Sequence, residues 1–134
     1  MNLVALIDYG SGNVHSAAGA LNEAARRTDI AVEVAITDDL ATIARADRII
    51  LPGVGHYGDC AANLHARPGL VDALETAVLN EGRPFLGICV GMQLLADFGL
   101  EDGETRGLGW IHGVVDRIDP GPGLRVPHVG WNEL

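Results

Sequence analysis

The sequence predicts an α/β protein built on a doubly wound, mostly parallel sheet. Three short apolar runs, at residues 3–7, 49–51 and 85–88, lack the alternation of a half-exposed strand, which is typical of strands covered on both faces. Segments with helical spacing of apolar residues separate these runs. Alternating strands and helices favour a parallel sheet, and 134 residues without an internal repeat or linker predict one domain, residues 1–134.

In the first half of the chain, the strand at residues 3–7 precedes a helix that is expected to begin at Val14. Apolar residues follow helical spacing from Val14 to Ala25, and Asn13 has the side chain of a good N-cap. Residues 30–36 form a further candidate strand. Because Glu33 interrupts it, we expect this strand nearer an edge of the sheet.

In the second half, helical spacing resumes over residues 70–78, and Gly82 suits the end of that helix. The strand at residues 85–88 is followed by a helix expected over residues 90–98, which ends at Gly99. Beyond Gly99 the pattern predicts a polar loop at 101–107, a strand at 113–118 and a turn at 120–123.

Composition and charge restrict the class of protein. The chain is 48% apolar but only 4% aromatic, so its core is expected to consist mainly of Val, Leu, Ile and Ala. The net charge is −9 and the nine basic residues form no run, so no nucleic-acid partner is expected. No segment resembles a signal peptide or reaches the ~20 apolar residues of a membrane span, so a cytoplasmic protein is expected.

Glycine-rich segments follow three of the predicted strands, at residues 8–13, 52–55 and 89–93. The carboxyl ends of parallel strands meet at one edge of a sheet, which is where α/β proteins place their sites. The sequence therefore predicts a functional site at this edge.

Cys89 is the candidate nucleophile, because it lies between a predicted strand and a predicted helix in a Gly-x-Cys-x-Gly pattern at residues 87–91. A sharp turn there would expose the side chain, and the N-terminus of the following helix would favour the thiolate. The backbone N–H of Val90 is then a candidate oxyanion donor. The alternative is a buried cysteine at a strand end, but the flanking glycines favour the nucleophile.

The turn of Gly53, Val54 and Gly55 beside this elbow has two interpretations. Glycines allow a peptide to face a reacting carbonyl, so the turn is a candidate for further oxyanion N–H groups. An ordinary tight turn explains the same residues equally well. Cys60 lies in no comparable pattern and is expected to be a packing thiol.

Other chemistries are not expected. Gly10 and Gly12 do not extend to a dinucleotide-binding G-x-G-x-x-G pattern, because His15 occupies its last position, and no G-K-[ST] sequence marks a phosphate loop. Two widely separated cysteines predict neither a disulfide framework nor a zinc site, so no cofactor and no metal is expected. No local pattern marks a base for Cys89 among the five histidines, which are His15, His56, His65, His112 and His128.

Four segments together resemble class I glutamine amidotransferases, and within that family the glutaminase subunits of imidazole glycerol phosphate synthase. They are Ile-Asp-Tyr-Gly-Ser-Gly-Asn at 7–13, Leu-Pro-Gly-Val-Gly at 51–55, Gly-Ile-Cys-Val-Gly-Met-Gln at 87–93 and Val-Pro-His-Val-Gly-Trp-Asn at 126–132. The third segment is shared by many amidotransferases, whereas the four in this order are specific. The resemblance covers essentially the whole chain and implies a flavodoxin-like, class I glutamine amidotransferase-like fold with a nucleophile elbow.

The resemblance also implies an activity and residue roles. Cys89 would attack the side-chain amide of glutamine, releasing ammonia and then glutamate. Val90 and the backbone of residues 53–55 would form the oxyanion hole, and Gly91 and Gln93 would bind the substrate.

A partner is implied as well. Ammonia would pass to a cyclase subunit, a TIM barrel, which makes imidazole glycerol phosphate and aminoimidazole carboxamide ribotide in histidine biosynthesis. The face that meets this partner would include Asn13, Gly55, Pro127, His128 and Trp131.

The chain departs from the family at its C-terminal side. The family completes its triad with His and Glu in an H-x-E arrangement, and no such pattern follows Gly91. We therefore expect a domain whose C-terminal part, with the triad His and Glu, is missing, and which has little activity alone. The missing strands would leave an unpaired sheet edge and uncovered apolar surface.

Three alternatives remain. The chain could be a non-catalytic docking module for the cyclase barrel, or an amidotransferase of another pathway, which residues 8–13 disfavour. A peptidase or small-molecule hydratase with a cysteine elbow is the third, and Gln93 and residues 127–131 disfavour it.

Overall fold

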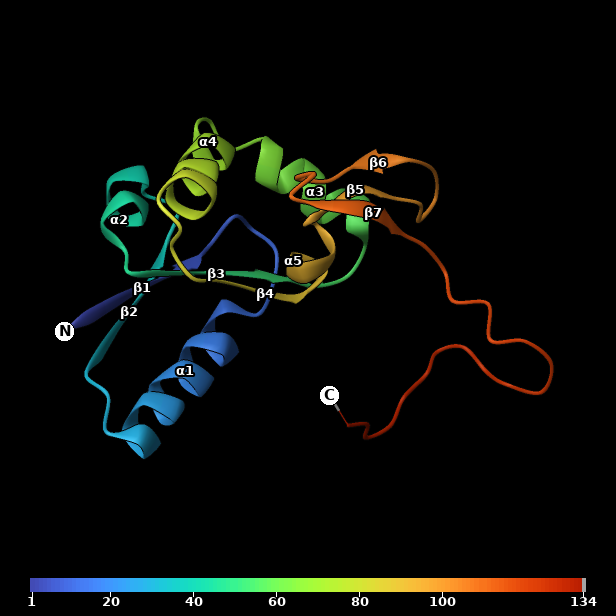
Figure 1. Ribbon diagram of the computed structural model, residues 1–134, viewed down its shortest axis with the longest axis horizontal. Helices are drawn as coiled ribbons and strands as arrows, with labels where there is room; N and C mark the ends of the chain where they lie inside the picture. Colours follow the sequence, from blue (N-terminus) through green and yellow to red (C-terminus); the bar gives the residue numbers. More distant parts are fainter. Residues whose placement is uncertain (134) are drawn as a thin grey trace.

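The computed structural model describes residues 1–133, which form a four-stranded parallel sheet and a smaller three-stranded sheet (Figure 1). The predicted doubly wound parallel sheet is confirmed, and the strand that contains Glu33 lies at its edge. The strand order is β2-β1-β3-β4, with β1 at Asn2–Ile7, β2 at Val32–Thr37, β3 at Arg48–Gly53 and β4 at Phe85–Cys89.

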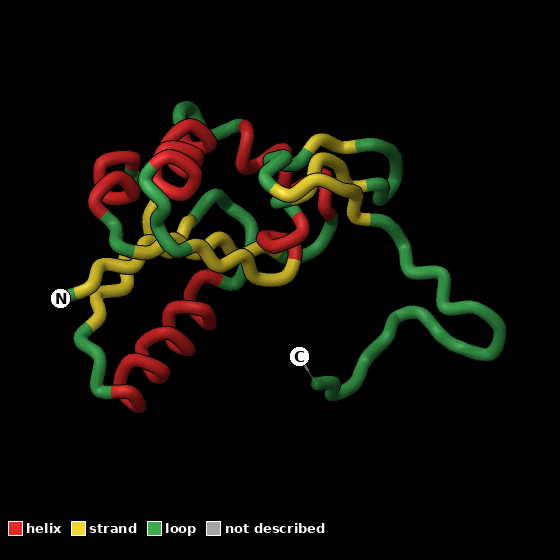
Figure 2. The backbone as a smooth tube through the Cα atoms, viewed as in Figure 1, coloured by secondary structure: helices red, strands yellow, loops and turns green. Residues whose placement is uncertain are grey.

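Helices cover both faces of the larger sheet (Figure 2). Helix α1 (Val14–Thr28) lies on one face, and α2 (Leu40–Arg45), α3 (Tyr57–His65) and α4 (Leu70–Glu75) lie on the other. Alternation along β1 directs Val4 and Leu6 toward α1, while Ala5 and Ile7 enter the larger core beneath α2–α4. Because both faces of β1 are covered, its sequence is apolar from Leu3 to Ile7.

Side-chain caps fix where two of the helices begin. Asn13 caps α1 as predicted, since its side chain accepts a hydrogen bond from the N–H of Ser16 at 3.1 Å. Asp39 caps α2 in the same way through the N–H of Thr42, at 2.8 Å. The sequence pattern predicts neither α2 nor α3, because both are short and depend on burial beneath neighbouring elements.

The predicted helix over residues 70–78 is confirmed. It comprises α4 and a following π-helical turn, η1 (Thr76–Asn80). Gly82 follows the helix with a φ of +69°, which suits the predicted stop.

The helix predicted over residues 90–98 is wrong beyond its first turn. Helix α5 is only Val90–Gln93, and the chain then enters β5 (Ala96–Gly99), the central strand of the smaller sheet. The carbonyls of Leu94 and Leu95 accept hydrogen bonds from the N–H groups of Leu108 and Ile111, at 2.7 and 2.9 Å. Long-range pairing therefore overrides the local helical pattern.

Two other strands complete the smaller sheet. They are β6 (Thr105–Arg106) and β7 (Ile111–Val115), so the strand predicted at residues 113–118 is displaced toward the N-terminus and the predicted loop at 101–107 contains a short strand. Residues 116–133 follow β7 as an extended segment without helix or strand (Figure 1). No helix within residues 1–133 has the length and apolar character needed to cross a membrane.

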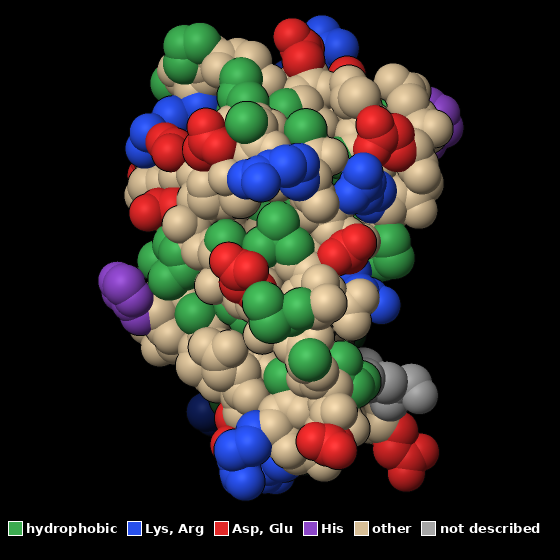
Figure 3. Space-filling view, turned by 90° about the vertical axis from the view of Figure 1, so that its left-hand side faces the viewer, with side chains coloured by type: hydrophobic (Ala, Val, Ile, Leu, Met, Phe, Trp, Pro, Cys, Tyr) green, Lys and Arg blue, Asp and Glu red, His purple; other side chains and the backbone are tan. Residues whose placement is uncertain are grey.

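Charged side chains of both signs are interspersed on the face that Figure 3 shows, with apolar side chains between them. Apolar side chains of β4 are also exposed, and within the described chain this strand pairs only with β3. Leu86 is 53% exposed and Ile88 is 38% exposed, because α1 packs over β1 and β2 and leaves β4 uncovered.

Candidate functional site

The carboxyl ends of β1, β3 and β4 bring the three glycine-rich segments to one edge of the larger sheet, as predicted. Cys89 ends β4 directly beside Gly53, its partner in the parallel register with β3. A Cβ atom on Gly12 would lie 2.8 Å from the Cβ atom of Pro52, so the loop of residues 8–13 packs closely on the 52–55 turn.

Cys89 has a backbone conformation that few non-glycine residues adopt. Its φ is 56° and its ψ is −121°, and its side chain is exposed. The neighbouring Gly91 is required by packing, since a Cβ atom there would overlap the carbonyl oxygen of Leu51. This is the sharp strand-to-helix turn that the sequence pattern predicts.

The helix behind the sulfur is shorter than predicted. It is a single turn of four residues instead of nine, so Cys89 is the N-cap of a single helical turn and not of a long helix. Val90 is buried against β3 at the start of this turn, which leaves its N–H next to Cys89.

Two buried side chains bind the carbonyls of the 52–55 turn. The Tyr9 hydroxyl donates to the Pro52 carbonyl at 2.6 Å, and the Cys60 thiol lies 3.3 Å from the Val54 carbonyl as a donor. Cys60 is a buried packing thiol as predicted, but the sequence contains no signal for its hydrogen bond. Gly55 has a φ of +85°, whereas Gly53 is packed tightly against Gly91.

A cavity of about 590 Å³ opens beside Cys89. Of the predicted site residues, Cys89, Val90, Gln93 and Gly55 line it, whereas Gly53, Val54 and Gly91 do not. The smaller sheet and the segment after it supply most of the other side of the cavity, including Glu101, Asp102, Asp116, Arg117 and Val126.

Sequence reasoning missed this second wall, because only the pairing of β5 with β7 brings it to Cys89. Glu101 is held in place by the N–H of Tyr57, which donates to its carboxylate at 2.8 Å. Burial raises the pKa of the neighbouring Tyr57 phenol above its usual range. The contact ties the loop after β5 to the start of α3.

No histidine of the described chain lines this cavity. His56 directly follows Gly55, which lines the cavity, but its ring nitrogens lie near carboxylates. The Nε2 atom is 3.3 Å from Asp102 and the Nδ1 atom is 3.8 Å from Asp59. Across residues 1–133, no group of three His, Cys, Asp or Glu side chains is arranged to hold a metal ion.

The residues that the resemblance assigns to a partner interface lie in three separate segments, and Gly55 is exposed in the 52–55 turn. Asn13 is exposed at the start of α1. Pro127, His128 and Trp131 are exposed in the extended C-terminal segment, where the Nδ2 atom of Asn132 lies 2.8 Å from the Nε2 atom of His128.

A model of the class-I glutamine amidotransferase family matches residues 5–124. Proteins named imidazole glycerol phosphate synthase subunit HisH are similar to nearly the whole chain. The one from Rhodospirillum rubrum is 54% identical over 132 residues, and the one from Ruegeria pomeroyi is 56% identical over 133; each alignment covers 98% of this chain and 62% of the relative. The chain thus spans about three fifths of the length of the curated relatives that it matches.

A solved structure described as a crystal structure of glutamine amidotransferase has a related fold. It superposes with a TM-score of 0.62 at 21% identity, covering 92% of this chain and 59% of that one. At this identity the likeness concerns the fold alone.

Proposed function

The chain belongs to the class-I glutamine amidotransferase family, and on that premise we propose that the intact protein releases ammonia from glutamine with Cys89 as its nucleophile. The observation that carries the proposal is the position of Cys89. It is exposed on a strained turn and opens into a cavity that Gln93 and Gly55 also line.

The reaction we propose has two covalent steps. The Cys89 Sγ atom forms a bond to the side-chain carbonyl carbon of glutamine, and the C–N bond then breaks as the nitrogen takes up a proton and leaves as ammonia. Water attacks the resulting thioester, the C–S bond breaks, and glutamate leaves with Cys89 restored. Oxygen carries negative charge in both tetrahedral intermediates.

Backbone N–H groups on two sides of the sulfur are proposed to bind that oxygen. Val90 would supply one from the first turn of α5, and the turn of residues 53–55 would supply the other. Gln93, the last residue of α5, lines the cavity and is proposed to hold the substrate. Gly91 is proposed to assist indirectly, since it is buried and allows α5 to lie close to β3.

The proton acceptor is proposed to lie outside residues 1–134. None of the described histidines lines the cavity, and the relatives are longer than this chain. The His and Glu of the family's H-x-E arrangement would supply this base and its orienting partner.

We propose a cyclase subunit of imidazole glycerol phosphate synthase as the partner that uses the ammonia. The names and identity of the HisH relatives support this assignment. Exposure of Asn13, Pro127, His128 and Trp131 leaves them available to a TIM barrel of this kind. The two free thiols suit a reducing cytoplasm.

A second candidate is a docking module without catalysis. The absence of a histidine from the cavity within residues 1–133 favours it for the chain as given. Binding to a cyclase barrel without release of glutamate by the intact protein would distinguish this candidate from an enzyme.

Labelling with a glutamine-like diazo ketone tests the proposed nucleophile. In the intact protein we expect one label, on the peptide that contains Cys89, and a loss of glutamate release of about 10³-fold or more in Cys89→Ser. The matched control is Cys60→Ser, which should be labelled at Cys89 as before. Mass spectrometry that located the label on any other residue would contradict the proposal.

A further inference from the structure

Two buried side chains, those of Tyr9 and Cys60, donate hydrogen bonds to the backbone of the 52–55 turn. Neither has a role in the reaction proposed above. Tyr9 is 1% exposed and Cys60 is 0% exposed, yet each directs a hydrogen-bond donor at that turn. A buried hydroxyl that lacks a partner is costly, and a phenylalanine would fill the space of Tyr9 without that requirement. The pairing of these donors with the turn therefore requires an explanation beyond packing.

The two donors hold peptides on either side of one central peptide. Tyr9 binds the carbonyl of Pro52 at 2.6 Å, and Cys60 binds the carbonyl of Val54 at 3.3 Å. Both peptides are trans, so each N–H points opposite to its carbonyl. The N–H of Gly53 therefore points away from Tyr9 and that of Gly55 points away from Cys60. The Gly53–Val54 peptide lies between these two anchored peptides.

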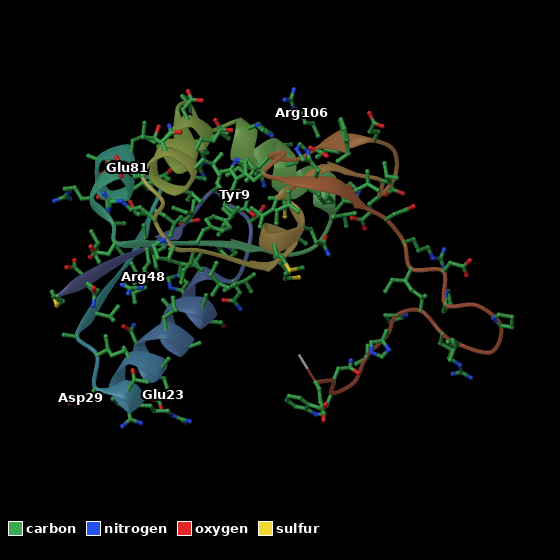
Figure 4. The ribbon with its side chains drawn as sticks, in the orientation of Figure 1. Tyr9, Glu23, Asp29, Arg48, Glu81 and Arg106 are labelled. Carbon is green, nitrogen blue, oxygen red and sulfur yellow. The ribbon has the colours of Figure 1, made fainter. Side chains whose placement is uncertain are left out.

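We infer that Tyr9 and Cys60 are positioning residues, which together set the direction of the N–H groups that the 52–55 turn offers to the oxyanion at Cys89. The inference rests on the proposed function and assigns to it two residues that do not touch the substrate. Tyr9, labelled in Figure 4, lies on the loop after β1, and Cys60 lies on α3, so two elements must be in place for the turn to adopt its working geometry.

Neighbouring contacts keep this arrangement rigid. Asn63 on α3 donates to the Ser11 hydroxyl at 3.0 Å, which joins α3 to the loop that contains Tyr9. Gly12 packs directly on Pro52. Burial, followed by the adjoining Cys60 thiol, raises the pKa of Tyr9 well above its usual range, so its hydroxyl remains a donor at any working pH.

Three substitutions in the full-length protein, assayed with its cyclase-type partner, test the inference. Tyr9→Phe and Cys60→Ala each remove one donor and should lower kcat for glutamine hydrolysis about tenfold or more, with KM nearly unchanged, since oxyanion donors act in the transition state. Cys60→Ser restores a donor and should stay within about threefold of the wild-type kcat.

Two measurements separate positioning from stability. Alkylation of Cys89 by iodoacetamide involves no oxyanion, so its rate, followed on the Cys89 peptide, should be the same in all variants. Ile43→Val, a buried change on α2, is the matched control that should lower Tm without lowering kcat.

Each outcome decides the question. If the wild type hydrolyses glutamine and Tyr9→Phe and Cys60→Ala keep its kcat, the inference is wrong while the proposed function stands. If kcat of Cys60→Ser is as low as that of Cys60→Ala, the hydrogen bonds do not position the turn. The same follows if Tyr9→Phe and Cys60→Ala slow the alkylation of Cys89 by as large a factor as they lower kcat. A wild-type protein without glutaminase activity would contradict the proposed function itself.

Discussion

At the scale of single residues, the site depends on a glycine that has no Cβ atom as well as on the candidate nucleophile. Gly91 allows α5 to lie on β3 at a distance that no side chain would permit, because a Cβ atom there would overlap the carbonyl oxygen of Leu51. That carbonyl belongs to backbone in the centre of the sheet, so it cannot move away at little cost. The position of Cys89 is therefore fixed by its neighbour.

Gly91→Ala should destabilise the protein by about 2–4 kcal/mol, because the clash is with backbone and not with a flexible side chain. Gly19→Ala is the matched control. It lies inside α1 with no atom within 4 Å of the added Cβ, so it should stabilise by about 0.5–1 kcal/mol. Urea unfolding of both variants measures the two values, and similar effects of the same sign would contradict this account.

At the scale of elements, the smaller sheet forms one wall of the cavity, and a carboxylate helps to join its parallel strands. Asp97 on β5 accepts a hydrogen bond from the N–H of Gly113 on β7 at 2.9 Å, and the His112 ring lies 3.4 Å from its other oxygen. The bond lies where the register of the two strands shifts. The Gly113 N–H, and next the His112 ring, hold the pKa of Asp97 below its usual value of 3.8.

This lowered pKa predicts acid sensitivity of the smaller sheet. The unfolded chain binds the proton more readily, so the contribution of Asp97 is fully present above pH 3.8 and is lost as pH falls through the lower, folded-state pKa. Asp97→Asn does not titrate, so the difference in unfolding free energy between wild type and variant should shrink in that window. Denaturant unfolding from about pH 6 to about pH 2.5 tests it, and a constant difference would exclude the linkage.

At the scale of the whole molecule, one face of the larger sheet is incompletely covered. Helix α1 packs mainly over β1 and β2, and an apolar hollow of about 370 Å³ lies between its C-terminal half and the sheet, extending to β4. Leu86 lines this hollow and is 53% exposed. An apolar face beside an unpaired strand edge favours association.

Residues 1–134 expressed alone should therefore self-associate as concentration rises, and Leu86→Glu should weaken the association about tenfold by placing a charge on that face. Leu79→Glu is the control, because Leu79 is 55% exposed but lies on η1, over the opposite face of the sheet. Sedimentation velocity measures both. Equal effects of the two substitutions, or a monomer at every concentration, would show that this face is not the contact.

The parallel sheet and its elbow could be predicted because their signals are local. Apolar runs predicted β1, β3 and β4. The Gly-x-Cys-x-Gly pattern predicted the sharp turn at Cys89, whose φ is 56°. The roles of Gln93 and of the partner-facing residues stay predictions. The prediction of a helix over residues 90–98 was wrong because the residues after Gln93 pair with strands that lie later in the chain. Sequence periodicity does not detect such pairing.

Local sequence patterns and steric requirements were enough to predict the layered fold, the position of the candidate nucleophile and the glycine-rich turn beside it. The surroundings of these features depend on tertiary packing. The acidic wall at Glu101 and Asp102 reaches Cys89 through the pairing of β5 with β7, and Tyr9 and Cys60 reach the 52–55 turn from two other elements. Contacts between segments far apart in the chain depend on how layers pack, and no local pattern encodes them.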